Sequence, residues 1–325
     1  MADRRFRHIA LRRVSTVALA LALGGIVDTT SATASQLIDR NARDVSLLVN
    51  GDEQALLSYR AGGSRKQVLA WGAVNAHAPS PTSPQVKFRL DYRGKGFKGG
   101  GCDRYTGPPL PWLVAACNAP DGSYWAAQAF PQPLPDLGFT PWSAAQRAVW
   151  LELSHWTGPV PQLDVGEAWV YGGRYHQIYG RLIYQGQPVY GFHTTRYGAP
   201  LGGYGSLVYL DVLNAPAYGP GWRRENSFVT HNPSGAFCYG FYTFDPTTGG
   251  YQHPPGQTAP RGPGIAATYR LTAHGPGVTP DIGWTGPGLG AYDAANAQAR
   301  QTQQFAVDQI KSWGERSCLA GHHGA

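Results

Sequence analysis

The chain has 325 residues and a formal net charge of +7, from 27 Lys and Arg against 20 Asp and Glu. Charged residues make up only 14%, aromatic residues make up 12%, and Gly and Pro are abundant, which excludes a disordered chain and favours a folded, turn-rich β protein. Five of the arginines precede residue 35, so the rest is mildly basic and no nucleic-acid partner is expected.

Residues 1–34 have the pattern of a secretory signal peptide. Arginines precede an apolar run over residues 14–27, and Ala32-Thr33-Ala34 supplies the small-x-small motif that signal peptidase cuts. We expect cleavage before Ser35, which leaves 291 residues, and a secreted, extracellular or cell-wall-associated location. An uncleaved leader acting as an anchor is the alternative, but its apolar stretch is short, and no membrane span is expected in the mature chain.

Short extended segments separated by Gly, Pro and Asn follow the leader, after a short helical turn expected at 36–43. The pattern predicts strands at 45–49, 54–60, 67–74, 86–92, 113–118, 124–130, the second half of 147–156, 165–171, 174–184, 189–195, 207–213, 227–231, 236–244, 265–272 and 281–284. In 147–156, apolar Leu151 and Leu153 alternate with Glu152 and Ser154, which is typical of a strand with one polar face.

One long helix is predicted at 293–313. Ala306, Ile310 and Trp313 share one helical face, Asp293 is a plausible N-cap, and Gly314 is a plausible stop. The predicted fold class is therefore mainly β, with antiparallel β-sandwich-like sheets of many short strands plus one C-terminal α-helix. Proline-rich residues 131–141 suggest an N-terminal β region (35–136), a main β region (137–292), and a C-terminal helix and tail (293–325).

The four cysteines indicate disulfides in an exported chain. Three pairings are possible, and sequence proximity favours Cys102 with Cys117, which leaves Cys238 to pair with Cys318. Because there is no paired CxxC and no HxxxH, neither a metal site nor a cofactor is expected.

Aromatic, basic and polar residues alternate most densely in residues 191–244. The expected ligand-binding residues are Arg196, Tyr197, Trp222, Arg223 and Glu225. Aromatic faces cover the C–H patches of sugars, while Arg and Glu bond hydroxyls, and Arg also grips anionic polymers. The alternative is that Arg223 or Arg224 pairs locally with Glu225 and the aromatic side chains belong to the core.

Recognised catalytic motifs are missing from the sequence, which has no Gly-x-Ser-x-Gly elbow and no isolated cysteine nucleophile. A glycosidase needs two carboxylates, and the pool is Glu152, Asp164, Glu167, Asp211 and Glu225. Glu225, with His231 nearby in the sequence as acid or base, is the weak catalytic candidate.

Three segments resemble uncharacterised secreted proteins of GC-rich actinobacteria: SHWTGP at 154–159, TTRYGAP at 194–200 and FCYGFY at 237–242. This resemblance implies export and no particular activity. We therefore expect an exported, non-catalytic binding or structural protein of the cell envelope or exterior, contacting polysaccharide or cell-wall polymer. The alternatives are a secreted hydrolase that acts on glycans through carboxylates, and a purely structural domain.

Overall fold

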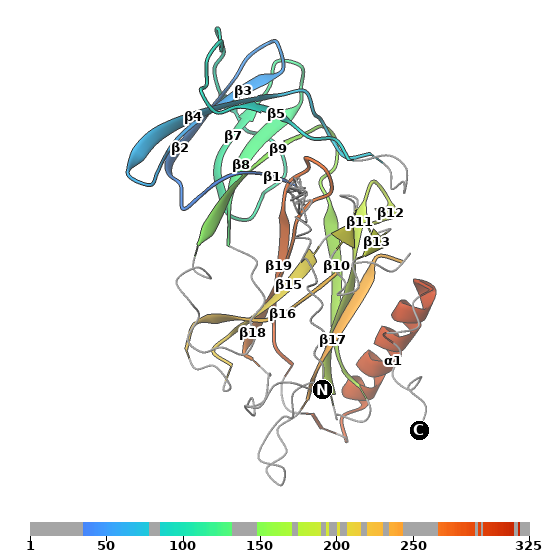
Figure 1. Cartoon of the computed structure of the whole chain (residues 1–325). Coiled ribbons are helices and arrows are strands. Elements are labelled where there is room, and N and C mark those ends of the chain that lie inside the picture. Colours follow the sequence, from blue (N-terminus) through green and yellow to red (C-terminus); the bar gives the residue numbers. More distant parts are fainter. Residues whose placement is uncertain are drawn as a thin grey trace, which may run out of the picture. The chain divides into compact units, whose positions relative to one another are not determined.

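A computed structural model describes residues 35–77, 85–131, 148–170, 175–189, 193–194, 200–201, 207–215, 220–229, 234–242, 266–289, 292–293, 295–314 and 318. All of them belong to one compact unit, residues 31–325. The fold is mainly β, with antiparallel sheets and one C-terminal helix, which confirms the predicted class (Figure 1). In these ranges, no helix is both long and apolar enough to cross a membrane.

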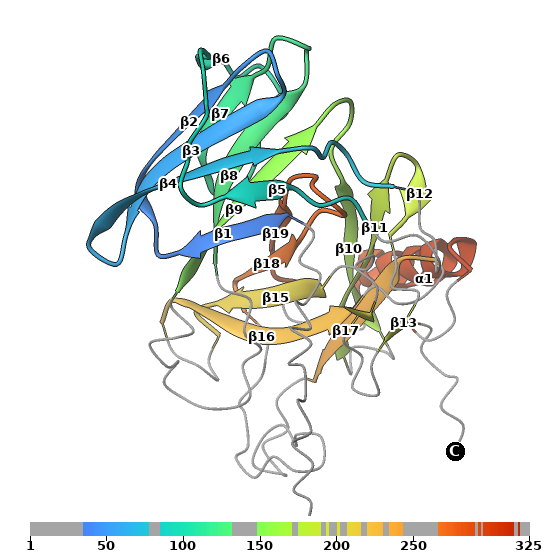
Figure 2. The same cartoon turned by 45° about the horizontal axis from the view of Figure 1, so that its top comes forward.

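The first two sheets share one hydrophobic core. One sheet has the order β1 (Gln36–Arg40), β9 (Val149–Trp156), β8 (Tyr124–Pro131), β7 (Leu113–Asn118) and β6 (Asp103–Arg104). The other has the order β2 (Arg43–Val49), β3 (Gln54–Ala61), β4 (Ser64–Trp71) and β5 (Arg89–Asp91). Leu47 and Leu57 from the second sheet pack in one core with Trp125 and Leu153 from the first, which is the sandwich arrangement (Figure 2).

Two further sheets enclose a second core. One contains β10 (Gln162–Val170), β11 (Tyr175–Tyr184), β12 (Gln187–Pro188) and β17 (Ala236–Tyr242). The other has the order β16 (Trp222–Val229), β15 (Leu207–Leu213), β18 (Thr268–Ala273) and β19 (Ile282–Pro287). Ile178 and Leu182 from the first meet Leu210 and Leu271 from the second. A short hairpin pairs β13 (His193–Thr194) with β14 (Pro200–Leu201).

Helix α1 (Ala297–Ser312) packs against β10 through the apolar face that the sequence predicts. Ala306 and Ile310 are buried, and Trp313 is packed against them. Gly314 has φ +72 and donates its N–H to the carbonyl of Lys311, so the predicted stop is confirmed. The helix begins four residues later than predicted, because Asp293 caps a preceding turn, accepting the N–H of Ala295 at 2.9 Å.

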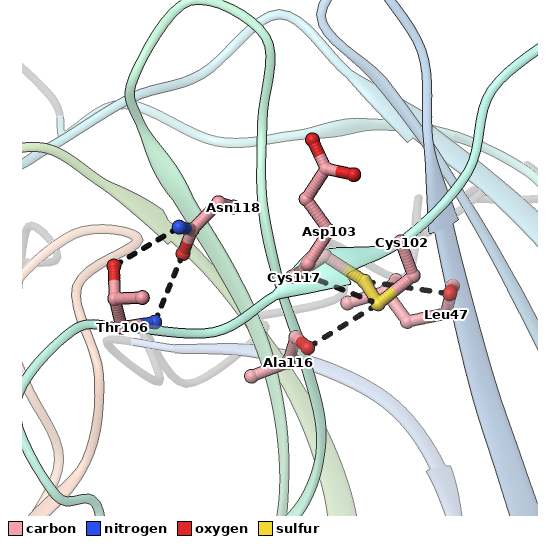
Figure 3. Close-up of a disulfide and its surroundings, with 7 residues drawn as sticks. All are labelled: Leu47, Cys102, Asp103, Thr106, Ala116, Cys117 and Asn118. Carbon is pink, nitrogen blue, oxygen red and sulfur yellow. Dashed lines mark hydrogen bonds between the residues drawn. A yellow bond between two sulfur atoms is a disulfide. The ribbon is translucent and has the colours of Figure 1, made fainter.

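Both predicted disulfides are confirmed. Cys102–Cys117 closes a span of 15 residues, and the buried Cys117 sulfur lies 3.5 Å from the Leu47 carbonyl oxygen of β2 (Figure 3). Cys238–Cys318 joins β17 to the segment that follows α1. The first bridge therefore ties β7 to the residue just before β6, its neighbour in the sheet.

Three local predictions are wrong in detail. Residues 36–43 form no helical turn, because Gln36–Arg40 pairs as β1 with the distant β9, and Asn41 turns the chain with φ +54. Of the strand predicted at 189–195, His193–Thr194 forms β13 and Val189 lies outside any strand, whereas residues 190–192 and 195 lie outside the described residues. Strand β16 begins five residues before the predicted 227, because Trp222 pairs with Leu213. The proposed boundary at 131–141 lies almost wholly outside the described residues and stays a prediction.

Candidate functional site

An open groove of about 770 Å³ lies beside β1 and β4. It is lined by two tyrosines, three basic side chains and other polar and apolar groups: Ile38, Asp39, Tyr59, Arg65, Lys66, Gln67, Tyr92 and Arg93. Tyr59 is 1% exposed, whereas Tyr92 is 59% exposed. One aromatic ring is therefore anchored in the fold, and the other is available to solvent.

A tight turn after β5 positions Tyr92 and Arg93 at the groove. Asp91 accepts the backbone N–H of Arg93 at 2.9 Å on its side chain and the N–H of Gly94 at 3.1 Å on its carbonyl. Gly94 has φ +61, and a Cβ there would lie 2.7 Å from the Cβ of Gln67. The turn can therefore approach β4 only because residue 94 is glycine.

Exposed ion pairs organise the charges of the groove. Lys66 donates to Asp39 at 2.7 Å, and Arg93 lies 3.1 Å from Asp91. Burial alone would raise the pKa of Asp39, but its hydrogen bonds from Lys66 and the Arg40 N–H hold that pKa below its usual value. Arg65, exposed on β4, forms no ion pair with the described residues, so one positive charge remains uncompensated.

A second group of polar side chains, here called the carboxylate cluster, is enclosed in the protein. It consists of Ser35, Glu152, His274 and Asp281, which are 0%, 0%, 4% and 0% exposed. The Ser35 hydroxyl lies 2.7 Å from Asp281 Oδ1 and 3.1 Å from Glu152 Oε2. His274 Nδ1 lies 3.1 Å from Asp281 and 3.4 Å from Glu152.

Neighbouring side chains fix this cluster in place. The amide of Gln128 on β8 bonds the backbone of Asp281 twice, accepting its N–H and donating to its carbonyl, both at 2.9 Å. The Phe130 ring lies 4.3 Å from the His274 ring between centroids. The carboxylate cluster is therefore held between the face of the first sheet that points away from the sandwich core and the segment joining β18 to β19.

Burial and mutual interaction move the pKa of every titratable group in the cluster. Burial and the adjacent Asp281 carboxylate raise the pKa of Glu152. Burial alone would lower the pKa of His274, but the two carboxylates raise it to about 10. Burial favours a higher pKa for Asp281, yet His274 lowers it overall. These directions favour a charged His274 and an ionised Asp281 beside a Glu152 that holds its proton more strongly than an exposed glutamate does.

The donor atoms of Glu152, His274 and Asp281 lie within 4.8 Å of one another, so these residues could hold a metal ion. Two carboxylates and one imidazole suit a divalent cation of the first transition row. No short ligand motif indicates this set, because Glu152 and His274 are 122 residues apart in the chain and Asp281 follows His274 by seven. The expectation of no metal site stays a prediction.

A third polar group lies between β10, β11 and β18. The Tyr269 hydroxyl lies 3.0 Å from His176 Nδ1, and His176 Nε2 lies 3.2 Å from Glu167. Burial raises the pKa of Tyr269, and the charges of Glu167 and Glu225 raise it further. Two carboxylates of the predicted pool, Glu167 and Glu225, therefore lie near Tyr269. His176 is 0% exposed, so its ring does not contact solvent.

The predicted ligand-binding residues are only partly described. Arg196, Tyr197 and the catalytic candidate His231 lie outside the described residues. Trp222 and Arg223 are half-buried, and the Arg270 guanidinium lies 4.4 Å from the Trp222 ring centroid. Glu225 is buried and accepts the Tyr239 hydroxyl at 2.9 Å.

Arg224 pairs with Asp211 instead of Glu225. The β-bulge at Leu210/Asp211 leaves Glu225 as the extra residue of β16, between Arg224, which pairs with Asp211, and Asn226, which pairs with Leu210. Arg224 and Glu225 are both buried, as are residues 208–212 of β15, so both faces of the sheet are covered here.

No protein-family model, curated protein or solved structure matches this chain. The groove, the carboxylate cluster and the Glu167–His176–Tyr269 group are therefore the features that bear on its function.

Proposed function

We propose that this protein is an exported, non-catalytic binding protein of the cell exterior or envelope, and that its groove binds an anionic polysaccharide or cell-wall polymer. The single observation that carries the proposal is the groove itself, in which exposed Tyr92 lies with Arg65, Lys66 and Arg93. The two disulfides are consistent with an oxidising location.

The chemistry of the groove fits a glycan with acidic groups. The Tyr92 ring offers a flat apolar face for the C–H side of a sugar, and Gln67 offers an amide for hydroxyl groups. Arg65 has a free guanidinium that can fork onto a carboxylate or phosphate. A neutral sugar would leave that charge unused, so an anionic polymer is the better match.

A hydrolase is the less favoured function. Glycosidases hold two carboxylates on either side of a substrate cleft. Glu152 and Asp281 do face each other, but both are completely buried and already bonded to Ser35 and His274. The groove itself is lined by one carboxylate, Asp39, which Lys66 neutralises.

The test is a sedimentation assay of the secreted protein on purified bacterial cell walls, with soluble polygalacturonate and dextran as competitors. We expect retention on cell walls, displacement by anionic polygalacturonate, and little effect of uncharged dextran. Tyr92→Ala is expected to weaken binding about three- to tenfold through lost stacking. Phe305→Ala, which removes a 64% exposed ring from α1, is the matched control and should bind normally.

Two results would remove the proposal. One is a wild-type protein that sediments with neither cell walls nor any anionic polymer. The other is equal binding by the wild type and Tyr92→Ala.

A further inference from the structure

Ser35 is notable both for its position in the chain and for its place in the carboxylate cluster. It is the residue that follows the predicted cleavage motif, so it would become the first residue of the exported chain. It is also 0% exposed, with its hydroxyl against both carboxylates of the carboxylate cluster. Covalent geometry places its α-nitrogen about 3 to 4 Å from that hydroxyl oxygen.

The cluster has one negative charge too many when both carboxylates are ionised. Glu152 and Asp281 face a single cation, His274, and no other Lys, Arg or His in the described ranges forms an ion pair with them. Arg224 approaches the Tyr209 ring beside the cluster but is paired with Asp211. Among the residues that the structure describes, the buried atoms Glu152 Oε1 and Asp281 Oδ2 also have no hydrogen-bond partner, so two acceptor atoms and one negative charge are not compensated.

We infer that cleavage after Ala34 turns the α-nitrogen of Ser35 into the missing cation, an ammonium group that neutralises the Glu152–Asp281 pair and completes the fold. Hydrolysis of the Ala34–Ser35 bond consumes one water and leaves a carboxylate on Ala34 and an ammonium on Ser35. Three N–H donors then replace one amide N–H, beside two acceptors that need partners. This inference rests on the proposed export of the chain.

The experiment compares a chain that begins at Ser35 with one that retains Ala34, each with Glu152 and with Glu152→Gln. Scarless cleavage of a fusion protein yields both chains without requiring export. Retaining Ala34 is expected to lower the Tm by about 5 °C with Glu152 and by less than about 2 °C with Glu152→Gln, where the excess charge is gone. Acetylation of the Ser35 α-nitrogen in the short chain, which removes the charge while adding a smaller group than Ala34, should repeat the loss.

Three results would overturn the inference. The first is an equal Tm loss with Glu152 and Glu152→Gln, which would show only a steric effect of the extra residue. The second is one tightly bound divalent metal ion per chain in elemental analysis, since the metal would then be the cation. The third is an exported chain whose sequenced N-terminus differs from Ser35. None of these readouts involves polymer binding, so a failure of the groove proposal stays distinguishable.

Discussion

The groove and the carboxylate cluster are built from similar side chains but differ in their access to water. In the groove, Lys66 and Asp39 pair at 2.7 Å with side chains that are 45% and 22% exposed. In the cluster, His274 and Asp281 pair at 3.1 Å with side chains that are 5% and 0% exposed. Water screens the Lys66–Asp39 pair but is excluded from the His274–Asp281 pair. Breaking the exposed pair should therefore change the stability little, whereas breaking the buried pair should change it strongly.

This difference separates binding from folding. Charged side chains in the groove are hydrated or paired with one another, and a ligand can replace those contacts at little cost in free energy. A binding surface needs this property. Charges in the cluster are committed to one another, because removing any one leaves its partners buried and uncompensated. Substitutions of the same residue type in the groove and in the carboxylate cluster measure how much more each buried group contributes to the free energy of unfolding.

Removing the cation should have the largest effect. We expect His274→Ala to lower the free energy of unfolding by about 3 to 5 kcal/mol, because it leaves two buried carboxylates facing each other. Lys66→Ala in the groove should cost less than about 1 kcal/mol. Since the carboxylates raise the pKa of His274 to about 10, its contribution is present at pH 6 and lost as the pH rises through 10.

Urea unfolding at pH 6, 8 and 10.5 provides the measurement for both variants. Similar losses for His274→Ala and Lys66→Ala would erase the distinction between the two regions.

Removing an amide should have an intermediate effect. Gln128→Leu leaves the N–H and carbonyl of Asp281 without partners inside the protein, and we expect a loss of about 2 to 3 kcal/mol. The control is Gln67→Leu, whose exposed amide donates to the Ser58 hydroxyl at 3.2 Å, with an expected change below about 0.5 kcal/mol. Equilibrium unfolding should rank the two glutamines in that order, and the reverse order would contradict the account.

The smallest effect concerns the acid dependence of the groove. Its ion pair and hydrogen bonds hold the pKa of Asp39 below the usual value, so its contribution is present above pH 4 and lost as the pH falls through the lower folded-state pKa. Asp39→Asn should therefore cost less than about 1 kcal/mol at pH 7 and almost nothing at pH 2. Thermal melts across this range test the trend, and a growing cost at low pH would be inconsistent with it.

Much of the fold could be predicted from local sequence. Period-two alternation located most strands, the helical face of Ala306 and Ile310 was found, and cysteine spacing gave both disulfides. The leading residues of β1 were misread because their pairing partner, β9, lies more than 100 residues away. Non-local pairing of this kind leaves no local signal.

The candidate sites were harder to predict for a related reason. Alternation in β9 assigned Glu152 to a polar face, but that face is covered by residues 274–281 and is as dry as the core. The groove likewise brings together Asp39, Lys66 and Tyr92 from three separate elements. The dense alternation of aromatic, basic and polar residues instead indicated residues 191–244 as the site. Within that range, Arg196, Tyr197 and His231 lie outside the described residues.

The central claim is that the groove holds charge available to a ligand, and reversing its one unpaired cation tests it most directly. Isothermal titration with polygalacturonate should show Arg65→Glu binding about tenfold or more weakly than the wild type, with the same Tm. Lys311→Glu, the same charge change at an exposed position on α1, should bind normally. Unchanged affinity of Arg65→Glu, or a loss of affinity that only accompanies a lower Tm, would contradict the account.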